Sequence, residues 1–180
     1  PCGVRISSSQ AGGESLQNSS AFKNGKFYIQ NSASMLAAYI LNPVSGDRVL
    51  DLCCGVGGKS THMAEQMRNK GKILACDIFE HKLNLLRNNA ERLGINIIET
   101  IKLDILTVDK KFHPGSFNKI LLDAPCSGLG VLNRRADLRW MQTPEKIREI
   151  ISLQKQMLDK AAALLEPGGT LLYSTCTINP

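Results

Sequence analysis

The chain has 180 residues, 43% of them hydrophobic, and it carries a formal net charge of +6 at neutral pH. This length and composition predict a single domain with a substantial core, and they exclude a disordered chain. The apolar runs fall short of the ~18 residues that a membrane-spanning helix requires, whereas the basic balance is compatible with a polyanionic partner such as nucleic acid.

The first 26 residues are rich in Ser, Gly and Gln at their start and contain no apolar segment, so we expect a linker or a loosely ordered lead-in rather than a signal peptide. We expect one folded domain over residues 27–180. Short apolar runs there alternate with helical patterns, which is typical of βαβ units around a parallel sheet. The predicted strands are 48–52, 72–77, 96–102, 117–123 and 170–174, and the predicted helices are 33–41, 59–69, 80–93 and a long one from Thr143 or Pro144.

The long helix has apolar residues at helical spacing as far as Leu165, and Pro167-Gly168-Gly169 is expected to end it before the last strand. These elements predict an α/β fold of the Rossmann-like type, in which helices flank a mostly parallel sheet.

A long loop, 124–142, takes the place of a helix after the fourth strand, and it carries Arg134, Arg135, Arg139 and the chain's single Trp, Trp140. Arginines can bind phosphates and an indole can stack on a base. A surface loop with Trp140 packed into the core is an equally good interpretation.

A glycine-rich turn follows the first strand, where the sequence reads Cys53-Cys54-Gly55-Val56-Gly57-Gly58-Lys59. A dinucleotide fingerprint would need Gly at position 60, which is Ser60, and a phosphate-binding P-loop would need Gly at position 53, which is Cys53. Two interpretations stay open: a loop that holds a nucleoside without phosphates, or a turn that binds nothing. Lys59 opens a helix, where a cation is unfavourable, so it has a role in the pocket or is simply solvated.

Three acids follow successive strands: Asp77, Asp104 and Asp123. Each alone is most often a turn residue or a helix cap. Because the carboxyl ends of parallel strands meet at one edge of the sheet, together they line a single crevice. Asp77 lies 20 residues after Gly57, where an acid can bind ribose hydroxyls.

Two cysteines occupy equivalent positions after the fourth and fifth strands, Cys126 in Asp-Ala-Pro-Cys-Ser-Gly and Cys176 in Ser-Thr-Cys-Thr. We expect both to face one pocket beside Asp123, although a free Cys is more often a buried small hydrophobe. With no CxxC cluster and no secretion signal, we expect reduced thiols, no bound metal and a cytoplasmic protein. The remaining cysteines are Cys2, Cys53, Cys54 and Cys76.

These motifs resemble the Sun/Nop family of RNA (cytosine-5) methyltransferases. The matching stretches are DLCCGVGGK (51–59), ILACD (73–77), LLDAPCSGLGV (121–131), PGGTLLYSTCT (167–177) and, more weakly, FYIQNSASML (27–36). The stretch DLRWMQTPEKI (137–147) is most similar to the bacterial small-subunit ribosomal RNA members. The chain departs from the family in Cys54-Gly55-Val56, where the usual loop has Ala-Ala-Pro, and in Asn31, which stands where an Asp is usual.

The resemblance implies S-adenosylmethionine as cofactor and RNA as substrate, with 16S ribosomal RNA as the first choice and transfer RNA as the second. It implies that residues 27–180 are a catalytic domain whose last strands lie beyond residue 180, and that an RNA-binding fragment without activity is an alternative. The implied cofactor residues are Cys53, Cys54, Gly55, Val56, Gly57, Gly58, Lys59, Asp77 for the ribose, Asp104 for the adenine, and Asp123; the implied catalytic residues are Cys176, Cys126, Asp123 and Lys59.

The implied reaction explains why these groups are needed. C5 of cytosine attacks a sulfonium methyl only after a thiolate, here that of Cys176, has added to C6. Asp123, held protonated, would stabilise the ring at N3, and Cys126 would assist the release of the product. A nucleotide-dependent enzyme, the competing function, is disfavoured by Cys53 and Ser60 in the glycine loop.

Overall fold

A computed structural model describes residues 3–4, 15–133 and 135–177 of the chain. Its centre is a five-stranded sheet in which all neighbouring strands are parallel. The strands are β1 (Arg48–Asp51), β2 (Lys72–Asp77), β3 (Ile98–Lys102), β4 (Phe117–Asp123) and β5 (Leu165–Ser174), in the spatial order β3-β2-β1-β4-β5. This is the predicted α/β fold.

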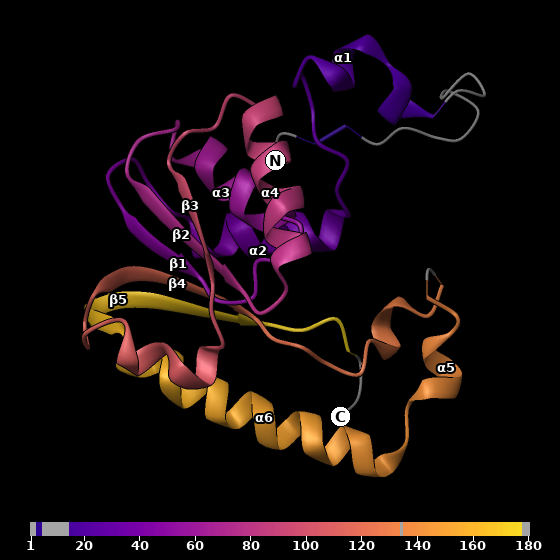
Figure 1. Cartoon of the computed structure of the whole chain (residues 1–180), viewed down its shortest axis with the longest axis vertical. Coiled ribbons are helices and arrows are strands. Elements are labelled where there is room, and N and C mark those ends of the chain that lie inside the picture. Colours follow the sequence, from indigo (N-terminus) through magenta and orange to yellow (C-terminus); the bar gives the residue numbers. More distant parts are fainter. Residues whose placement is uncertain (1–2, 5–14, 134, 178–180) are drawn as a thin grey trace.

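Helices cover both faces of the sheet, as Figure 1 shows. One layer holds α2 (Ser32–Leu41), α3 (Gly58–Gln66) and α4 (Glu80–Arg92), and the opposite layer holds α6 (Pro144–Ala163) and the 3-10 helix η2 (Ile105–Lys110). Among the described helices, the 20-residue α6 included, we find no segment with the length and hydropathy of a transmembrane span.

The alternation of side chains along β1 builds the two halves of the core. Leu50 and Leu52 face the α6 layer and pack with Met157 and Ala161 of that helix. Val49 faces the other layer and packs with residues of α2 and α3. Because both faces of β1 are covered, its apolar side chains are fully buried, and its last residue, Asp51, is carried into the interior with them.

The chain runs from β1 outward to β2 and β3 on one side and to β4 and β5 on the other. The strand order therefore reverses between β1 and β4, which is where doubly wound sheets bind their ligands. Asp51 ends β1 and Asp123 ends β4, so the reversal places a pair of acids side by side.

The end of α6 differs from the prediction. The helix ends at Ala163, and Leu165 already belongs to β5, which runs through Pro167-Gly168-Gly169. The register shifts between Phe117 and Lys119 of β4, and Gly168 has a φ of 82°. The Pro-Gly-Gly segment is thus a bulge within a strand rather than a turn before one, since Gly adopts this backbone without strain.

Other elements begin or end a few residues away from their predicted positions. The helix predicted over 59–69 ends at Gln66, because Arg68 and Asn69 adopt positive φ angles of 54° and 55°. The loop 124–142 contains two short helices, η3 (Leu129–Val131) and α5 (Leu138–Met141). Part of the predicted lead-in is helical as well, in η1 (Leu16–Asn18) and α1 (Ser20–Lys23), and the guanidinium of Arg92 lies 3.8 Å from the Phe22 ring centroid.

Candidate active site

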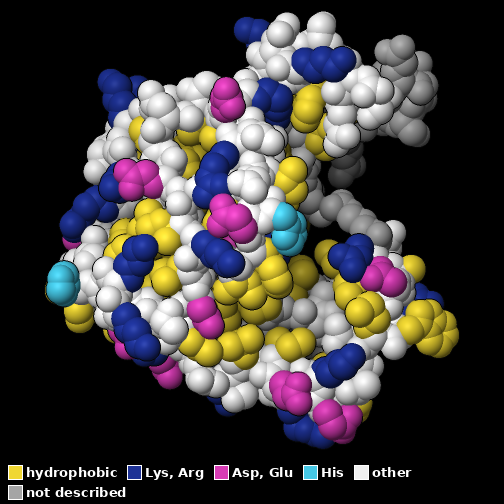
Figure 2. Space-filling model, viewed as in Figure 1, with side chains coloured by type: hydrophobic (Ala, Val, Ile, Leu, Met, Phe, Trp, Pro, Cys, Tyr) yellow, Lys and Arg dark blue, Asp and Glu magenta, His cyan; other side chains and the backbone are white. Residues whose placement is uncertain are grey.

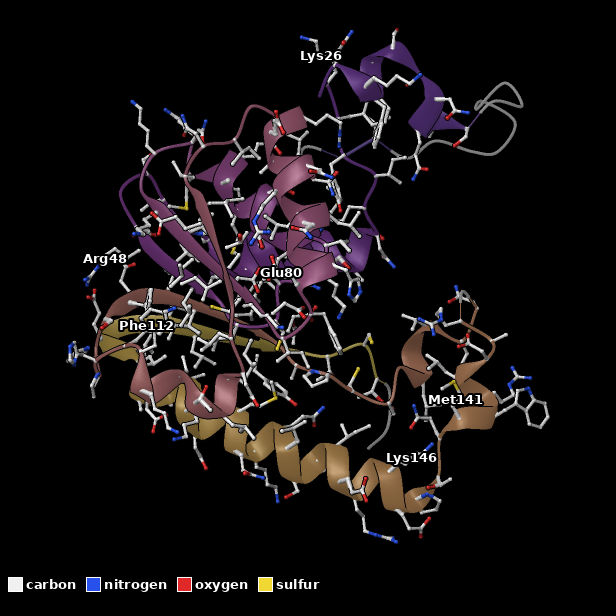
Figure 3. All side chains as sticks on the ribbon, in the orientation of Figure 1. Lys26, Arg48, Glu80, Phe112, Met141 and Lys146 are labelled. Atoms are coloured by element: carbon white, nitrogen blue, oxygen red, sulfur yellow. The ribbon has the colours of Figure 1, made fainter. Side chains whose placement is uncertain are left out.

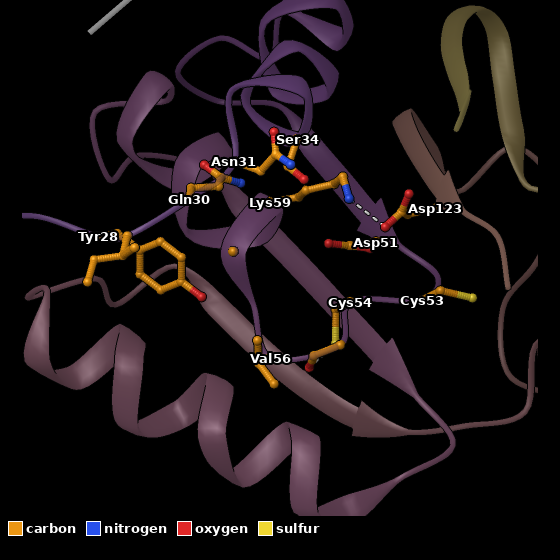
Figure 4. A pocket seen from close by; sticks show the side chains of 13 residues that line it. Tyr28, Gln30, Asn31, Ser34, Asp51, Cys53, Cys54, Val56, Lys59 and Asp123 are labelled. Carbon is orange, nitrogen blue, oxygen red and sulfur yellow. Dashed lines mark hydrogen bonds and ion pairs between the residues drawn. The ribbon is translucent and has the colours of Figure 1, made fainter. Parts of the chain in front are cut away.

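A cavity of about 290 Å³ opens at the point where the strand order reverses. Figure 4 shows that the glycine turn after β1 forms one wall, and that Lys59 and Asp123 meet at one end. Among the predicted site residues, the cavity is lined by Cys53, Cys54, Gly55, Val56, Gly58, Lys59 and Asp123. Its other lining residues are Tyr28, Ile29, Gln30, Asn31, Ser34 and Asp51.

The glycine turn needs its glycines for two different reasons. Gly55 and Gly57 have φ angles of 55° and 90°, a region that residues with a side chain rarely adopt. At Gly57 an added Cβ would also lie 2.5 Å from Cγ of Leu86 in α4, so this glycine lets the turn pack against that helix. Gly57 thus shapes the turn and is not itself among the residues that line the cavity.

Asp77 supports the turn from the end of β2. Its Oδ2 accepts a hydrogen bond from the Gly55 backbone N–H at 3.0 Å, and its Oδ1 accepts one from the Phe79 N–H at 2.9 Å. Asp77 is buried and does not line the cavity. Asp104 lies further away as the exposed cap of η2, where its Oδ1 accepts from the Leu106 N–H at 2.9 Å. The three predicted acids therefore do not share one cavity, and only Asp123 lines it.

Asp51 is a site residue that we did not single out from the sequence. It is 1% exposed, its Oδ2 accepts a hydrogen bond from the Ser60 hydroxyl at 2.6 Å, and its Oδ1 has no partner among the described residues. Burial, more than the nearby charge of Asp123, raises its pKa to about 7. From the sequence alone, an acid that ends a buried strand is not distinguishable from a turn residue.

The segment 28–34 is the second part of the site that sequence reasoning underrated. Only the weak family match FYIQNSASML pointed to it. Gln30 lines the cavity, and its amide Nε2 is buried without a partner among the described residues. Asn31 caps α2 by accepting from the Ala33 N–H at 2.8 Å, so the departure from the usual Asp keeps the cap.

Asp123 is held from two sides. Nζ of Lys59 lies 2.5 Å from its Oδ2, and the hydroxyl of Ser174 in β5 donates to its Oδ1 at 2.7 Å. The Lys59 side chain is 18% exposed, which answers the question that the sequence left open: it lies in the pocket and is not solvated. Both oxygens of Asp123 accept hydrogen bonds here, an arrangement that favours an acceptor role for this carboxyl over the donor role to the cytosine N3 that we expected.

The two candidate cysteines lie together, as the sequence predicted, but neither lines the cavity that Asp123 lines. Their Sγ atoms are 3.0 Å apart, and the backbone N–H of Cys176 donates to Sγ of Cys126 at 3.2 Å. Cys126 is half-buried and Cys176 is exposed. The pair adjoins Asp123 because Cys176 follows Ser174, which contacts Asp123, by two residues.

The loops that carry the cysteines are tied to each other and to α6. The Ser127 and Thr177 hydroxyls are 2.7 Å apart, and the Gly130 N–H donates to the Cys176 carbonyl at 3.0 Å. Gln154 of α6 donates to the Pro125 carbonyl at 2.7 Å. The close approach of the thiols is therefore fixed by contacts on both sides.

The thiols differ in their surroundings. Burial, a hydrogen bond to Cys126 and the charge of Asp123 raise the pKa of Cys176 to about 11. Burial likewise raises the pKa values of Cys53 and Cys76 to about 12, and that of Cys54 further still. Cys176 is thus a protonated thiol at neutral pH in this state, and a base must take its proton before it can act as a nucleophile. Within the described part of the chain, no cluster of His, Cys, Asp and Glu is suited to hold a metal ion.

Comparison with known proteins identifies the family. A family model described as 16S rRNA methyltransferase RsmB/F matches residues 38–180. The probable ribosomal RNA small subunit methyltransferase B of Bacillus subtilis is 42% identical over 158 residues, which are 88% of this chain and 35% of that protein. Human tRNA (cytosine(72)-C(5))-methyltransferase NSUN6 is 38% identical over 162 residues, covering 84% of this chain and 34% of its own. The chain therefore spans about a third of the length of these relatives.

Solved structures agree with this. PH0851 has a TM-score of 0.88 and 40% identity, over 92% of this chain and 37% of its own. NSun6 from Pyrococcus horikoshii, solved with SFG, has a TM-score of 0.83 and 35% identity, over 92% of this chain and 42% of its own. An S-adenosylmethionine-dependent O-methyltransferase from Thermotoga maritima, 19% identical with a TM-score of 0.57 over 85% of this chain and 48% of its own, shares the fold alone. The chain belongs to the RsmB/F family of 16S rRNA methyltransferases, as its resemblance to the Sun/Nop proteins predicted.

Proposed function

We propose that this chain is the catalytic part of an enzyme that transfers a methyl group from S-adenosylmethionine to C5 of a cytosine in RNA, with Cys176 as the nucleophile. The observation that carries the proposal is the pair of thiols at 3.0 Å, beside an Asp123 that lines the cavity. The family and its relatives, which are named for ribosomal and transfer RNA methylation, support it. Such an enzyme would work in the cytoplasm, where thiols stay reduced.

The cavity fits the amino acid end of S-adenosylmethionine, which carries an ammonium and a carboxylate. Asp51 Oδ1 is a buried acceptor without a partner among the described residues, and Gln30 Nε2 is a similarly unpaired donor. Unpaired buried polar atoms are costly, so a pocket that holds one of each kind favours a ligand with both charges. When bound, the cofactor would supply an electrophilic methyl group.

The nucleoside end would extend toward Asp77 and Asp104. Each oxygen of the Asp77 carboxylate already accepts one backbone hydrogen bond, and a carboxylate oxygen has capacity for a second. Asp77 can therefore accept from ribose hydroxyls while it holds the glycine turn. The exposed Asp104 is free to accept from the adenine amino group. In this arrangement the turn, which has Cys54-Gly55-Val56 in place of the usual residues, lies under the cofactor.

The target cytosine would enter between Asp123 and the thiols, flipped out of any stack. Asp123 would accept a hydrogen bond from the exocyclic N4 amine, as carboxylates do with cytosine, and Lys59 is the cation beside it. Cys126 Sγ lies 3.0 Å from Cys176 Sγ, within reach of the ring that Cys176 would attack. The Cys176 sulfur would bond to C6 as its proton leaves to solvent, which would make C5 nucleophilic toward a methyl group. In the release step Cys126, as a thiolate, would accept the C5 proton while the C6–S bond breaks and its electron pair returns to the Cys176 sulfur.

Ribosomal RNA is the first candidate substrate, because the family model and the Bacillus relative carry that description. Transfer RNA is the second, because the NSUN6 relatives named for it are nearly as similar, at 40% for the mouse protein. Methylation assays with naked 16S ribosomal RNA and with transfer RNA transcripts separate the two, since C5 methylation of only one would identify the substrate class.

The cofactor assignment is tested by calorimetric titration of the chain with S-adenosylmethionine. We expect saturable binding that Asp77→Ala abolishes and that Asp51→Asn weakens about 10- to 100-fold, the usual effect of losing a hydrogen bond to a charged group. Asp109→Asn, an exposed acid on η2 that pairs with Lys160, serves as the control. Unchanged affinity in Asp51→Asn would reject the role of the Asp51 carboxylate in binding, and no binding by the folded chain would reject the cofactor pocket.

The roles of the thiols are tested in an active, full-length protein with substrate RNA. We expect Cys126→Ala to accumulate a denaturant-stable protein–RNA adduct, because the nucleophile remains while release is impaired. We expect Cys176→Ala to form none. An adduct with the Cys176 variant would reverse the two assignments.

A further inference from the structure

Trp140 is the only Trp of the chain, and it is 86% exposed on the short helix α5. The sequence left open whether this side chain packs into the core, and the structure places it outside. An indole is a large apolar surface that normally buries most of its area, so an indole in solvent is unusual unless a partner covers it.

Trp140 lies in a lobe formed by residues 129–133 and 135–142, which include η3 and α5, and this lobe is fixed to the loop of Cys126. The Gln142 side chain donates to the Ser127 carbonyl at 2.9 Å, and Leu138 packs so closely on Gly128 that a Cβ there would lie 2.6 Å from it. Figure 3 shows the lobe standing away from the sheet at Met141 and Lys146, where Lys146 Nζ donates to the Met141 carbonyl at 3.0 Å. In Figure 2 a hollow separates this lobe from the body of the molecule.

These links limit the distance between the lobe and the reacting groups. Through Gln142 and Ser127, the Cα of Trp140 lies within about 20 Å of that of Cys126, given the reach of an extended chain. A nucleic acid strand that rises about 3.4 Å per nucleotide covers this distance in about six nucleotides.

The charge next to the indole is positive. Arg139 precedes Trp140, is exposed, and has no carboxylate partner among the residues that the structure describes. Its neighbours are different, because Arg135 is paired with Asp137 and Arg148 with Glu145. Arg134 lies outside the described residues. An exposed indole beside a guanidinium that no described carboxylate neutralises is a suitable surface for a base and its phosphate.

We propose that Trp140 is a stacking platform for one base of the substrate strand, within about six nucleotides of the target cytosine, with Arg139 on an adjoining phosphate. The proposal rests on the proposed function, because it takes RNA as the partner. The stacking contact would position the substrate, because a base held on the lobe fixes the register of the strand while the target base is turned into the site. Trp140 is then a positioning residue and touches none of the reacting atoms.

The single Trp makes the proposal directly measurable. The 180-residue chain is titrated with an end-labelled, single-stranded oligoribonucleotide with a central cytosine, and label anisotropy and indole emission are recorded together. We expect the emission to be quenched in parallel with binding and to become protected from acrylamide. Trp140→Ala is expected to bind about 5- to 100-fold more weakly, the usual effect of losing one stacked base, whereas Trp140→Phe stays within a few-fold of the unmodified chain.

Matched variants separate stacking from general surface effects. Tyr39→Ala removes another exposed aromatic side chain, on α2, and should leave affinity unchanged. Arg139→Gln should lower the slope of log affinity against log salt concentration by about 1, the change expected for the loss of one phosphate contact. In a series of oligonucleotides that each lack one base, the indole emission should fail to be quenched for a single abasic position, which lies within about six nucleotides of the cytosine.

The outcomes are distinguishable. Three results would overturn the role of Trp140 and leave the proposed function standing, provided that anisotropy shows RNA binding. They are unchanged indole emission, equal affinity of Trp140→Ala and the unmodified chain, and no abasic position that affects quenching. No saturable binding would remove the RNA partner and this inference with it. Emission that changes with protein concentration alone would assign the surface to a second protein copy.

Discussion

At the scale of single residues, the charge of Asp123 bears on Cys176. It is one of the causes that raise the pKa of this thiol, after burial and the contact with Cys126. The proposed reaction needs a thiolate, whereas these surroundings favour the protonated thiol of Cys176.

Removing the charge of Asp123 should therefore make Cys176 more reactive. In Asp123→Asn the pKa of Cys176 falls, and because the thiol is mostly protonated at pH 8, its thiolate fraction rises by up to about tenfold per unit of pKa. The measurement is the rate of alkylation by iodoacetamide, read on the Cys176 peptide by mass spectrometry. Glu99→Gln, an exposed acid in β3, is the control. Slower alkylation of Asp123→Asn would show that Asp123 instead helps to deprotonate the thiol.

The 3.0 Å separation of the two sulfurs predicts an oxidation product. One equivalent of hydrogen peroxide should join Cys126 and Cys176 in a disulfide, with both thiol protons leaving in two molecules of water. Peptide mapping should find this crosslink and its reversal by dithiothreitol, while the buried Cys54 and Cys76 stay reduced. Oxidation of either thiol to a sulfinic acid without crosslinking would contradict the observed proximity.

At the scale of elements, the turn between β1 and α3 combines a backbone constraint with a packing constraint. Gly57 and Gly46 both have strongly positive φ angles, 90° and 98°. A Cβ at Gly57 would lie 2.5 Å from Leu86, whereas at Gly46 it would meet nothing within 4 Å. The two glycines therefore form a matched pair that differs in the packing constraint.

Alanine at the two positions separates these effects. In Gly46→Ala the free energy of unfolding should fall by about 1 kcal/mol, because only the backbone conformation is unfavourable for Ala. In Gly57→Ala the free energy of unfolding should fall by about 1–3 kcal/mol more, because α4 must shift to relieve the overlap with Leu86. Urea denaturation gives both free energies of unfolding. Equal losses in the two variants would mean that Leu86 moves aside at no cost.

The elements themselves were predictable where one local signal dominates. The helix start at Thr143-Pro144 was recognisable because Thr is a common helix cap and Pro favours the first turn. The structure confirms it, since the Thr143 hydroxyl accepts a hydrogen bond from the Lys146 N–H. The end of the same helix was not, because Pro167-Gly168-Gly169 reads as a turn in isolation. It becomes a bulge only through its pairing with β4, which the sequence of the segment does not contain.

At the scale of the whole molecule, the buried Asp51 couples stability to pH. Its pKa is raised from 3.8 to about 7, so in that range the folded chain holds a proton that the unfolded chain has lost. The free energy of unfolding should therefore fall as pH rises from about 4 to about 7, by about 4 kcal/mol at most from this residue, and stay constant above.

The neutral variant Asp51→Asn tests this dependence. Its stability relative to the unmodified chain should increase through the same pH range, since Asn loses no proton. Urea denaturation at several pH values provides the curve, with Glu99→Gln as an exposed control. A stability difference that does not vary with pH would show that Asp51 is ionised in the folded protein.

The sequence by itself determined the fold class, the family, the turn that lines the cavity and the pair of cysteines. The reason is that apolar periodicity and glycine requirements are local, and that parallel strands bring their carboxyl ends to one edge whatever their order. Only the tertiary structure decided that Asp51 is buried with one oxygen that no described residue pairs, that Lys59 pairs with Asp123, and that Trp140 is exposed to solvent. Burial and charge pairing depend on neighbours brought from distant parts of the chain, and no local pattern encodes them.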